Sequence, residues 1–247
     1  MTTSNVLKQR LLQEKYGGFE TEDFLTDIKR LEKGEPYEYV LGYTDFLGAK
    51  IDLSYRPMIP RPETAFWVKA AIAELKTRNG ALRLADTYAG SGNVGLALLL
   101  NLPQATVDFT EIDPNLKLQI EKNLELNHIA SNRARVFSAA NLDGLTGLYD
   151  AILAVPPYVP REALPDPEMR DYEPHLAFFA QDNGHEFHQY LIAGAYNFLK
   201  PGGVLFMEAD YDHNEKIRDL VTNTPWSSLE FWPDPYGATP NVVLRKA

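Results

Sequence analysis

The 247-residue chain carries 34 acidic and 24 basic residues, a formal charge of −10 at pH 7, and it has no cysteine. The absence of cysteine excludes disulfides, cysteine nucleophiles and thiolate metal sites. Because nucleic-acid binding relies on Lys and Arg to neutralise phosphates, the acidic balance argues against a nucleic-acid-binding protein. The polar start, Met1 to Asn5, is unlike a signal peptide, and no apolar run of about eighteen residues is present, so we expect a cytoplasmic protein without a membrane span.

The first part of the chain differs in pattern from the rest. Two short amphipathic helices are expected within residues 4–33, separated by Gly17 and Gly18. Residues 37–55 are rich in aromatic and β-branched side chains, which suggests a β-hairpin. We therefore expect a short N-terminal helical segment with a reduced substrate-recognition role (1–33), a β-hairpin linker (34–62) and a main domain (63–247).

Helical patterns and short apolar runs alternate through the main domain. Helices are expected over 63–78, from 92, from 114 and over 185–199. Strands are expected at 82–87, 105–111, 134–138, 149–154, 203–208, 228–232 and 241–245. This alternation predicts an α/β fold, a Rossmann-like parallel sheet with helices on both faces. The last two strands are joined without a helix and should form an antiparallel hairpin at the sheet edge, while the long irregular segment 156–183 is a functional candidate.

A glycine-rich turn between Asp86 and Gly95 follows the first strand of this sheet. Such a turn lets the backbone approach a cofactor at the carboxyl edge of a parallel sheet. Glu111 closes the next strand, where a carboxylate can accept hydrogen bonds from both hydroxyls of a ribose. The alternative is a tight turn beside a solvated acid, but the two features together favour an adenosine-containing ligand.

A proline pair follows the fourth strand at the same edge of the sheet. The strand ends at Ala154 and continues into Val155, Pro156, Pro157 and Tyr158. Adjacent prolines make a rigid, extended segment, and Tyr158 adds an aromatic face. The segment resembles the Asn-Pro-Pro-Tyr motif of amino-methyltransferases, in which side-chain and backbone oxygens orient a planar nitrogen for attack on a methyl group.

Further segments narrow the resemblance to the HemK/PrmC family, which methylates the glutamine of the Gly-Gly-Gln loop in class I peptide-chain release factors. Residues 59–64 read Ile-Pro-Arg-Pro-Glu-Thr, the most family-specific motif, and residues 34–42 and 172–177 are also similar to family segments. Residues 199–203 resemble a segment that is common to many methyltransferases. The resemblance implies a class I S-adenosyl-L-methionine (SAM)-dependent methyltransferase fold with SAM as cofactor. It also implies a release factor as protein substrate and partner, and we expect the enzyme to be a monomer.

The resemblance also assigns site residues. The implied catalytic segment consists of Val155, Pro156, Pro157 and Tyr158. The implied cofactor-binding residues are Asp86, Tyr88, Ala89, Gly90, Ser91, Gly92, Glu111, Asn141 and Leu142. No metal site is expected, because His185 and His188 share a helical face without a third ligand at usable spacing, so we expect solvated or helix-capping histidines.

Three positions in the implied site depart from the family pattern. Tyr88 stands where the family has a turn glycine, Asn141 where it has an acidic residue, and Val155 where it has the catalytic Asn. Losing one preorganised catalytic side chain costs on the order of 10²–10³ in rate. The sequence thus favours a SAM-dependent protein-glutamine methyltransferase with weakened or altered activity. The alternatives are a catalytically inactive SAM-binding or scaffold relative that docks a protein partner, and a nucleic-acid amino-methyltransferase, which the acidic charge disfavours.

Overall fold

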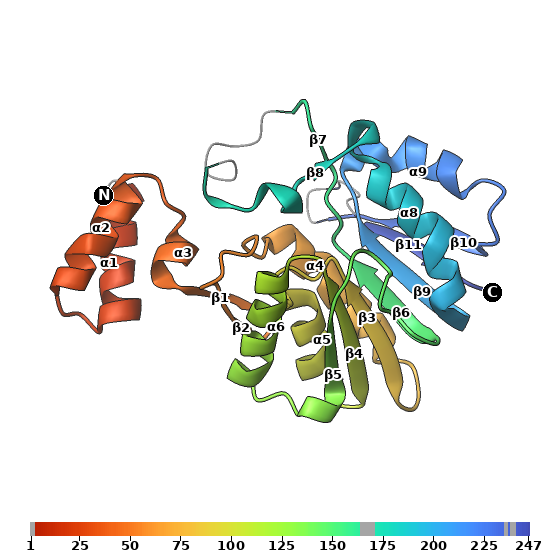
Figure 1. The fold of residues 1–247 in the computed structure, drawn as a ribbon, viewed down its shortest axis with the longest axis horizontal. Helices are drawn as coiled ribbons and strands as arrows, with labels where there is room; N and C mark the ends of the chain where they lie inside the picture. The colour runs from red at the N-terminus through yellow and green to blue at the C-terminus, as the bar shows by residue number, and fades with distance from the viewer. Residues whose placement is uncertain (1–2, 164–170, 235–236, 238–240) are drawn as a thin grey trace.

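The computed structural model describes residues 3–163, 171–234, 237 and 241–247. Its central feature is a seven-stranded sheet in the order β10-β11-β9-β6-β3-β4-β5 (Figure 1). The strands are β3 (Leu82–Thr87), β4 (Ala105–Glu111), β5 (Ala134–Ser138), β6 (Tyr149–Ala154), β9 (Leu199–Glu208), β10 (Ser228–Trp232) and β11 (Asn241–Arg245). All neighbours from β9 to β5 pair parallel, whereas β11 runs antiparallel to both β9 and β10. The α/β fold and the antiparallel edge hairpin are therefore confirmed.

Helices cover both faces of this sheet (Figure 1). The longer ones are α4 (Pro62–Leu75), α5 (Asn93–Asn101), α6 (Pro114–Leu126), α8 (Glu186–Gly194) and α9 (Asn214–Val221). Successive strand residues enter different buried clusters, since Leu84 and Leu153 pack with α4 and α5 while Ala85 and Ile152 pack with α8 and α9. This alternation is the period of two that a strand buried on both faces requires.

The main domain differs from the expected elements at a few places. Helix α9 was not expected, although Ile217, Leu220 and Val221 recur at the spacing of one helical face and pack against the same buried cluster. The helix has only eight residues, so this signal is short. The helix expected over 185–199 ends at Gly194 and continues as a short 3-10 helix, and β9 begins at Leu199 rather than 203. That 3-10 helix is Ala195–Phe198, and others span Ser131–Arg133, His175–Ala177, Asp182–Gly184 and Tyr211–His213.

The N-terminal part forms its own small core beside the main domain (Figure 1). It contains α1 (Thr3–Tyr16), α2 (Glu22–Glu32), α3 (Tyr37–Leu41) and a hairpin of β1 (Tyr43–Phe46) with β2 (Ala49–Asp52). The two expected helices are confirmed. The hairpin expected over 37–55 is right for 43–52 but wrong for 37–41, which are helical. Tyr37 and Val40 are buried together with Leu11 and Phe24 of α1 and α2, so tertiary packing overrides their β-propensity.

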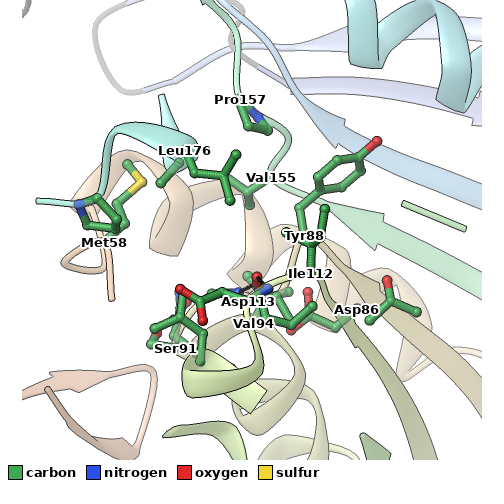
Figure 2. Close-up of a pocket in the computed structure, with 18 of the residues that line it drawn as sticks. Met58, Asp86, Tyr88, Ser91, Val94, Ile112, Asp113, Val155, Pro157 and Leu176 are labelled. Carbon is green, nitrogen blue, oxygen red and sulfur yellow. Dashed lines mark hydrogen bonds between the residues drawn. The ribbon is translucent and has the colours of Figure 1, made fainter. Parts of the chain in front are cut away.

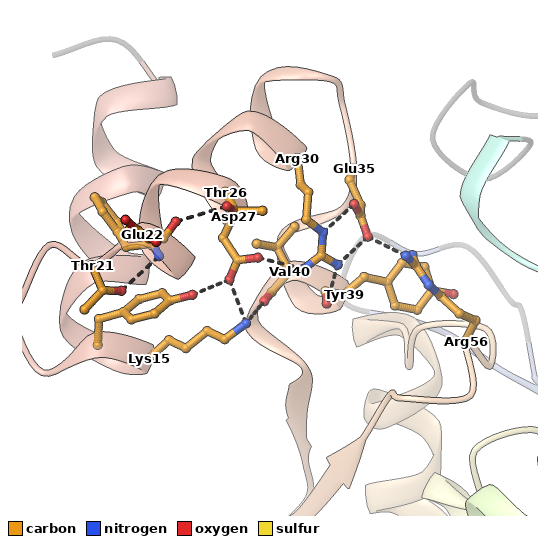
Figure 3. A network of polar contacts seen from close by, with 12 residues as sticks. Lys15, Thr21, Glu22, Thr26, Asp27, Arg30, Glu35, Tyr39, Val40 and Arg56 are labelled. Carbon is orange, nitrogen blue, oxygen red and sulfur yellow. Dashed lines mark hydrogen bonds and ion pairs between the residues drawn. The ribbon is translucent and has the colours of Figure 1, made fainter.

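A network of ion pairs holds this N-terminal part together (Figure 3). Asp27 is buried and accepts hydrogen bonds from Lys15 and from Arg30, both at 2.7 Å. Arg30 also binds Glu35, which lowers the pKa of that carboxyl. Glu35 in turn accepts from Arg56 at 2.6 Å. The chain of charges runs from α1 to the segment that leads into the main domain, and it fixes the helices relative to that segment.

Polar side chains on α6 tie the hairpin to the glycine-rich turn. Gln119, Asn123 and Asn127, spaced every fourth residue, bond to the backbone of residues 50–55. Asn123 is fully buried and also donates to the carbonyl oxygen of Ser91 at 2.9 Å. One helix face thus positions the hairpin and the turn at the carboxyl edge of β3.

Candidate active site

A cavity opens at the carboxyl edge of the sheet and contains about 1070 Å³ of space, its open mouth included (Figure 2). Its walls come from segments within residues 58–64, 86–94, 110–116, 139–141, 155–157 and 174–177, and from Phe187. Of the predicted site residues, those that line it are Asp86, Tyr88, Ala89, Gly90, Ser91, Glu111, Asn141, Val155 and Pro157. The predicted residues Gly92, Leu142, Pro156 and Tyr158 are not among its lining residues. The structure therefore brings most of the predicted set together around one cavity.

Glu111 is buried at the end of β4, on the wall next to the glycine-rich turn. Its Oε2 accepts a hydrogen bond from the backbone N–H of Gly90 at 2.8 Å, and its Oε1 accepts from that of Asp113 at 2.9 Å. Burial raises the pKa of this carboxyl, while the backbone donors oppose the shift. Each carboxylate oxygen has a second lone pair, so Glu111 can still accept bonds from two hydroxyls of a ligand.

Asp86 ends in the same cavity from β3 and is almost fully buried. Its Oδ2 accepts from the N–H of Gly95 at 2.7 Å, and burial raises its pKa to about 8. A Cβ at position 95 would lie 2.1 Å from the ring of Phe109 and 3.0 Å from the Asp86 carboxylate. Glycine is thus required where α5 meets the strands, a close approach that the sequence pattern alone only suggests.

Tyr88 has φ of 59°, the left-handed conformation that favours glycine. Its ring packs edge to face on Phe187 with centroids 5.5 Å apart, and its hydroxyl is buried without a hydrogen-bond partner among the residues that the structure describes. The side chain also packs against the buried cluster beneath α8. Tyr88 is therefore one wall of the cavity and does not fill it (Figure 2).

Val155 follows β6 and lies beside Tyr88 in the cavity wall (Figure 2). The preceding residues, Ala154 and Thr87, are register partners in the parallel pair β6 and β3, so Val155 and Tyr88 emerge from neighbouring strands at the same level. Val155 presents an isopropyl group to the cavity, with neither a donor nor an acceptor. The wall where a methyl acceptor was predicted is therefore apolar at this position.

Tyr158 has a different environment from the one that the sequence suggested. Its hydroxyl donates to Oε1 of Glu208 at 3.1 Å, behind the cavity wall. Glu208 is buried at the end of β9, and its other oxygen accepts from Thr64 and Trp67 at 2.7 Å each. Burial raises the pKa of Glu208, and the three donors oppose the shift. The signal that could have revealed Glu208 is an acidic residue that closes a buried strand.

His188 is fully buried inside α8, so the expectation of solvated or helix-capping histidines is wrong for this residue. His213 is also buried, but it stands at the N-cap position of α9, which the expectation allowed. The His188 ring lies between two carbonyl oxygens, 3.2 Å from that of Gly184 and 3.0 Å from that of Glu208. Burial lowers the pKa of His188 to about 4. His185, by contrast, does occupy the N-cap of α8 as expected. Within the part of the chain that the structure describes, no group of three or more His, Cys, Asp or Glu is arranged to hold a metal ion.

Glu173 connects the segment after the proline pair to the segment before α4. Its carboxylate is buried, with Oε1 bound by Arg61 at 2.6 Å and Oε2 by the N–H of Ile59 at 2.9 Å. The contact carries Pro174 and Leu176 to the cavity, where they line it together with residues 58–61. The long irregular segment was expected to be functional, and its described ends form β7 (Val159–Pro160), which pairs with β8 (Phe179–Ala180), while 164–170 lie outside the described residues.

No helix among the described residues is long and apolar enough to cross a membrane.

Solved structures with a similar fold are methyltransferases. The ribosomal protein L11 methylase of Lactobacillus delbrueckii subsp. bulgaricus has a TM-score of 0.56 at 18% identity, covering 80% of this chain and 84% of that one. A 16S rRNA N2 methyltransferase of T. thermophilus, solved with AdoMet and guanosine, has a TM-score of 0.59 at 18% identity, covering 83% of this chain and 50% of that one. The fold, together with a glycine-rich turn and a strand-end acid on one cavity, defines a class I SAM-dependent methyltransferase.

Sequence relatives identify the family. The release factor glutamine methyltransferase of Bifidobacterium longum is 34% identical over 224 residues, covering 85% of this chain and 76% of the relative. That of Bacteroides thetaiotaomicron is 32% identical over 215 residues, with the same coverage. No family model matches the chain. The chain belongs to the release factor glutamine methyltransferase family, whose members use SAM as methyl donor, and the resemblance seen in the sequence is confirmed.

Proposed function

We propose that the chain transfers the methyl group of SAM to the side-chain amide nitrogen of a glutamine in a class I peptide-chain release factor. One observation carries the proposal: in a member of this family, Glu111 and the segment from Val155 to Pro157 line the same cavity at the carboxyl edge of the sheet. A cofactor bound at the first and an acceptor placed at the second would meet inside that cavity. This function implies that the protein works in the cytoplasm, where release factors act.

The residues on the cavity suit an adenosine-containing cofactor. The acceptor oxygens of Glu111 would hold the ribose hydroxyls, and the backbone from Tyr88 to Gly92 would lie against the rest of the molecule. Asn141 lines the cavity with φ of 53°, a conformation held by the hydrogen bond from Thr110 to its carbonyl oxygen at 2.6 Å. Leu142 is buried directly behind it and would act by packing. When bound, SAM supplies an electrophilic methyl group on a sulfonium.

The acceptor side has to orient the glutamine amide. The nitrogen forms a bond to the methyl carbon as the carbon–sulfur bond breaks, and one N–H proton leaves to water. Val155 offers no side-chain acceptor for those N–H bonds, so backbone carbonyl oxygens of the lining residues Val155 and Pro157 would do this work. With fewer acceptors to orient the amide, the rate of methyl transfer should be roughly 10²–10³ lower than in an enzyme that also has a side-chain acceptor.

We also propose that the N-terminal part contacts the protein substrate. The sequence assigned this role to residues 1–33, and α3 packs with α1 and α2 in one core, so the contact unit extends to Leu41. The charge network from Asp27 to Arg56 would keep that unit at a fixed position relative to the cavity.

The test is a transfer assay with radiolabelled SAM and an intact class I release factor. We expect slow incorporation that requires the glutamine of the Gly-Gly-Gln loop, so a release factor with Ala in its place should remain unlabelled. Labelling that persists in that release factor would contradict the assigned acceptor. SAM binding without any incorporation would instead support an inactive relative.

A further inference from the structure

The order of the strands decides what lies at the centre of the cavity. In the sheet, β3 stands between β6 and β4. A ligand held by Glu111 at the end of β4 and facing Val155 at the end of β6 must cross the end of β3. Tyr88 is the residue that follows β3 there, and it lines the cavity. The part of SAM between its ribose and the transferred methyl is the sulfonium sulfur, which therefore comes to Tyr88.

Two aromatic side chains meet at this point. Tyr88 and Phe187 both line the cavity, and their rings pack at 64° with centroids 5.5 Å apart. Within the described part of the chain the buried hydroxyl of Tyr88 has no hydrogen-bond partner, and we therefore attribute the role of this side chain in the cavity to its ring. The left-handed backbone at Tyr88 is an unfavourable conformation for a bulky residue, and such conformations persist where the surrounding structure over-determines them, most often at ligand sites.

We propose that Tyr88 and Phe187 form an aromatic wall that recognises the positive charge of the sulfonium. An aromatic face attracts a cation, and the attraction grows when the cation is removed from water. Val155 beside Tyr88 adds apolar surface, which lowers the local dielectric and strengthens the effect (Figure 2). The wall distinguishes charged SAM from neutral S-adenosylhomocysteine, the product left after methyl transfer. The inference rests on SAM as the cofactor in the proposed function.

Calorimetric titration of the purified protein with each of the two compounds tests the wall. Tyr88→Leu removes the aromatic ring, and we expect SAM to bind about 5- to 30-fold more weakly while S-adenosylhomocysteine changes by less than about twofold. Tyr88→Phe keeps the ring and should keep the preference for SAM. Tyr190→Leu, on the same helix as Phe187 but outside the cavity lining, is the matched control and should change neither affinity.

An equal loss of affinity for both compounds in Tyr88→Leu would overturn the inference, because it would reveal a packing role without charge recognition. Phe187→Leu is a second test of the wall, at a position with ordinary helical backbone. It can replace Tyr88→Leu if thermal melting shows that the Tyr88→Leu variant is not folded. Neither measurement needs a methyl acceptor. If the unaltered protein prefers SAM to S-adenosylhomocysteine through Tyr88 but transfers no methyl group, the aromatic wall is supported and the proposed reaction is contradicted. If the unaltered protein does not bind SAM, both the wall and the proposed reaction are overturned.

Discussion

The two sides of the cavity are built differently. On the β4 side, Glu111 and Asp86 meet backbone N–H groups, and their hydrogen bonds hold the glycine-rich turn in place. On the β6 side, Val155 presents an apolar surface, Leu176 lines the mouth, and Tyr158 directs its hydroxyl to Glu208 behind the wall. In the proposed function, cofactor binding and methyl acceptance therefore depend on the ends of different strands.

Two of the departures from the family pattern are structural neighbours. Because Thr87 and Ala154 are register partners, the next residues, Tyr88 and Val155, stand side by side. The Val155 side chain packs against the buried cluster that includes α4 and α5, and the Tyr88 side chain packs against the cluster beneath α8. We infer that these two substitutions form one change from a polar to an apolar wall and should be reversed together.

The largest expected effect comes from reversing that pair. Tyr88→Gly with Val155→Asn should raise glutamine methylation at saturating SAM by on the order of 10²–10³, since it restores a side-chain acceptor and the turn glycine of the family pattern. Saturation is required because loss of the Tyr88 ring is expected to weaken SAM binding. Val155→Asn alone should gain less, because Tyr88 would still replace the turn glycine at the end of the neighbouring strand. Turnover measured on a release factor for the wild type, the two single variants and the double variant gives the coupling. If the single Val155→Asn variant reaches the full gain, the two positions act independently.

The sequence predicted the side of the site that depends on backbone and strand ends. The turn and Glu111 could be placed because parallel strands end at one edge, and both do line the cavity. The orientation of the Tyr158 side chain could not be predicted, because it depends on Glu208, which is 50 residues away in the chain. The buried carboxylate of Glu208 needs hydrogen-bond donors, and the Tyr158 hydroxyl is one of them.

The fold was predictable for the same physical reason. Apolar runs that alternate with helices predict a parallel sheet before the pairing of the strands is known, and six of the seven strands of the central sheet were placed to the residue. The exception is β9, which begins four residues before its expected start. Residues 37–41 were not, because their helix depends on burial against α1 and α2 rather than on local propensity. The contributions of Met58, Leu176 and Phe187 to the cavity also depend on long-range packing. The only sequence signal that could have indicated these lining residues was that they lie close in the chain to the recognised motifs.

On the cofactor side, Glu111→Ala should weaken SAM binding by about 100-fold. The change removes the ribose acceptor and also strands the N–H groups of Gly90 and Asp113, and hydrogen bonds to a charged group contribute roughly 1.5–3 kcal/mol each. Glu121→Ala, an exposed position on α6, is the control for loss of one negative charge and should bind normally. Calorimetric titration with SAM measures both variants. If Glu111→Ala binds SAM within a few-fold of the wild-type affinity, Glu111 is not the ribose acceptor.

Between the two sides, Glu173→Ala should destabilise the fold by roughly 2 kcal/mol. It leaves Arg61 without its partner and the N–H of Ile59 unsatisfied, and Arg61 is partly exposed, which reduces the cost of a broken buried pair. Chemical denaturation measures the change, with exposed Glu162→Ala as the control. A loss no larger than that of the control would mean that the contact does not hold the cavity mouth to the residues before α4.

The smallest expected effect is a change in how stability depends on pH. The pKa of Asp86 is raised to about 8 in the folded protein, above its value of about 3.9 in an unfolded chain. The folded state therefore binds the extra proton across this interval, and stability falls as pH rises from about 4 to 8. Asp86→Asn removes that contribution, so the melting temperature of the variant should fall less than that of the wild type between pH 5 and 8.

This comparison isolates Asp86 because the other buried titrating groups are unchanged in the variant. Burial also raises the pKa of Glu111 and Glu208, so part of the decline should remain in Asp86→Asn. The lowered pKa values of His188 and His213 have the opposite sign and add stability as pH rises through the lower part of the window. Exposed Asp45→Asn should melt with the wild-type pH profile. Equal slopes in wild type and Asp86→Asn would show that the carboxyl of residue 86 is ionised in the folded protein throughout this range.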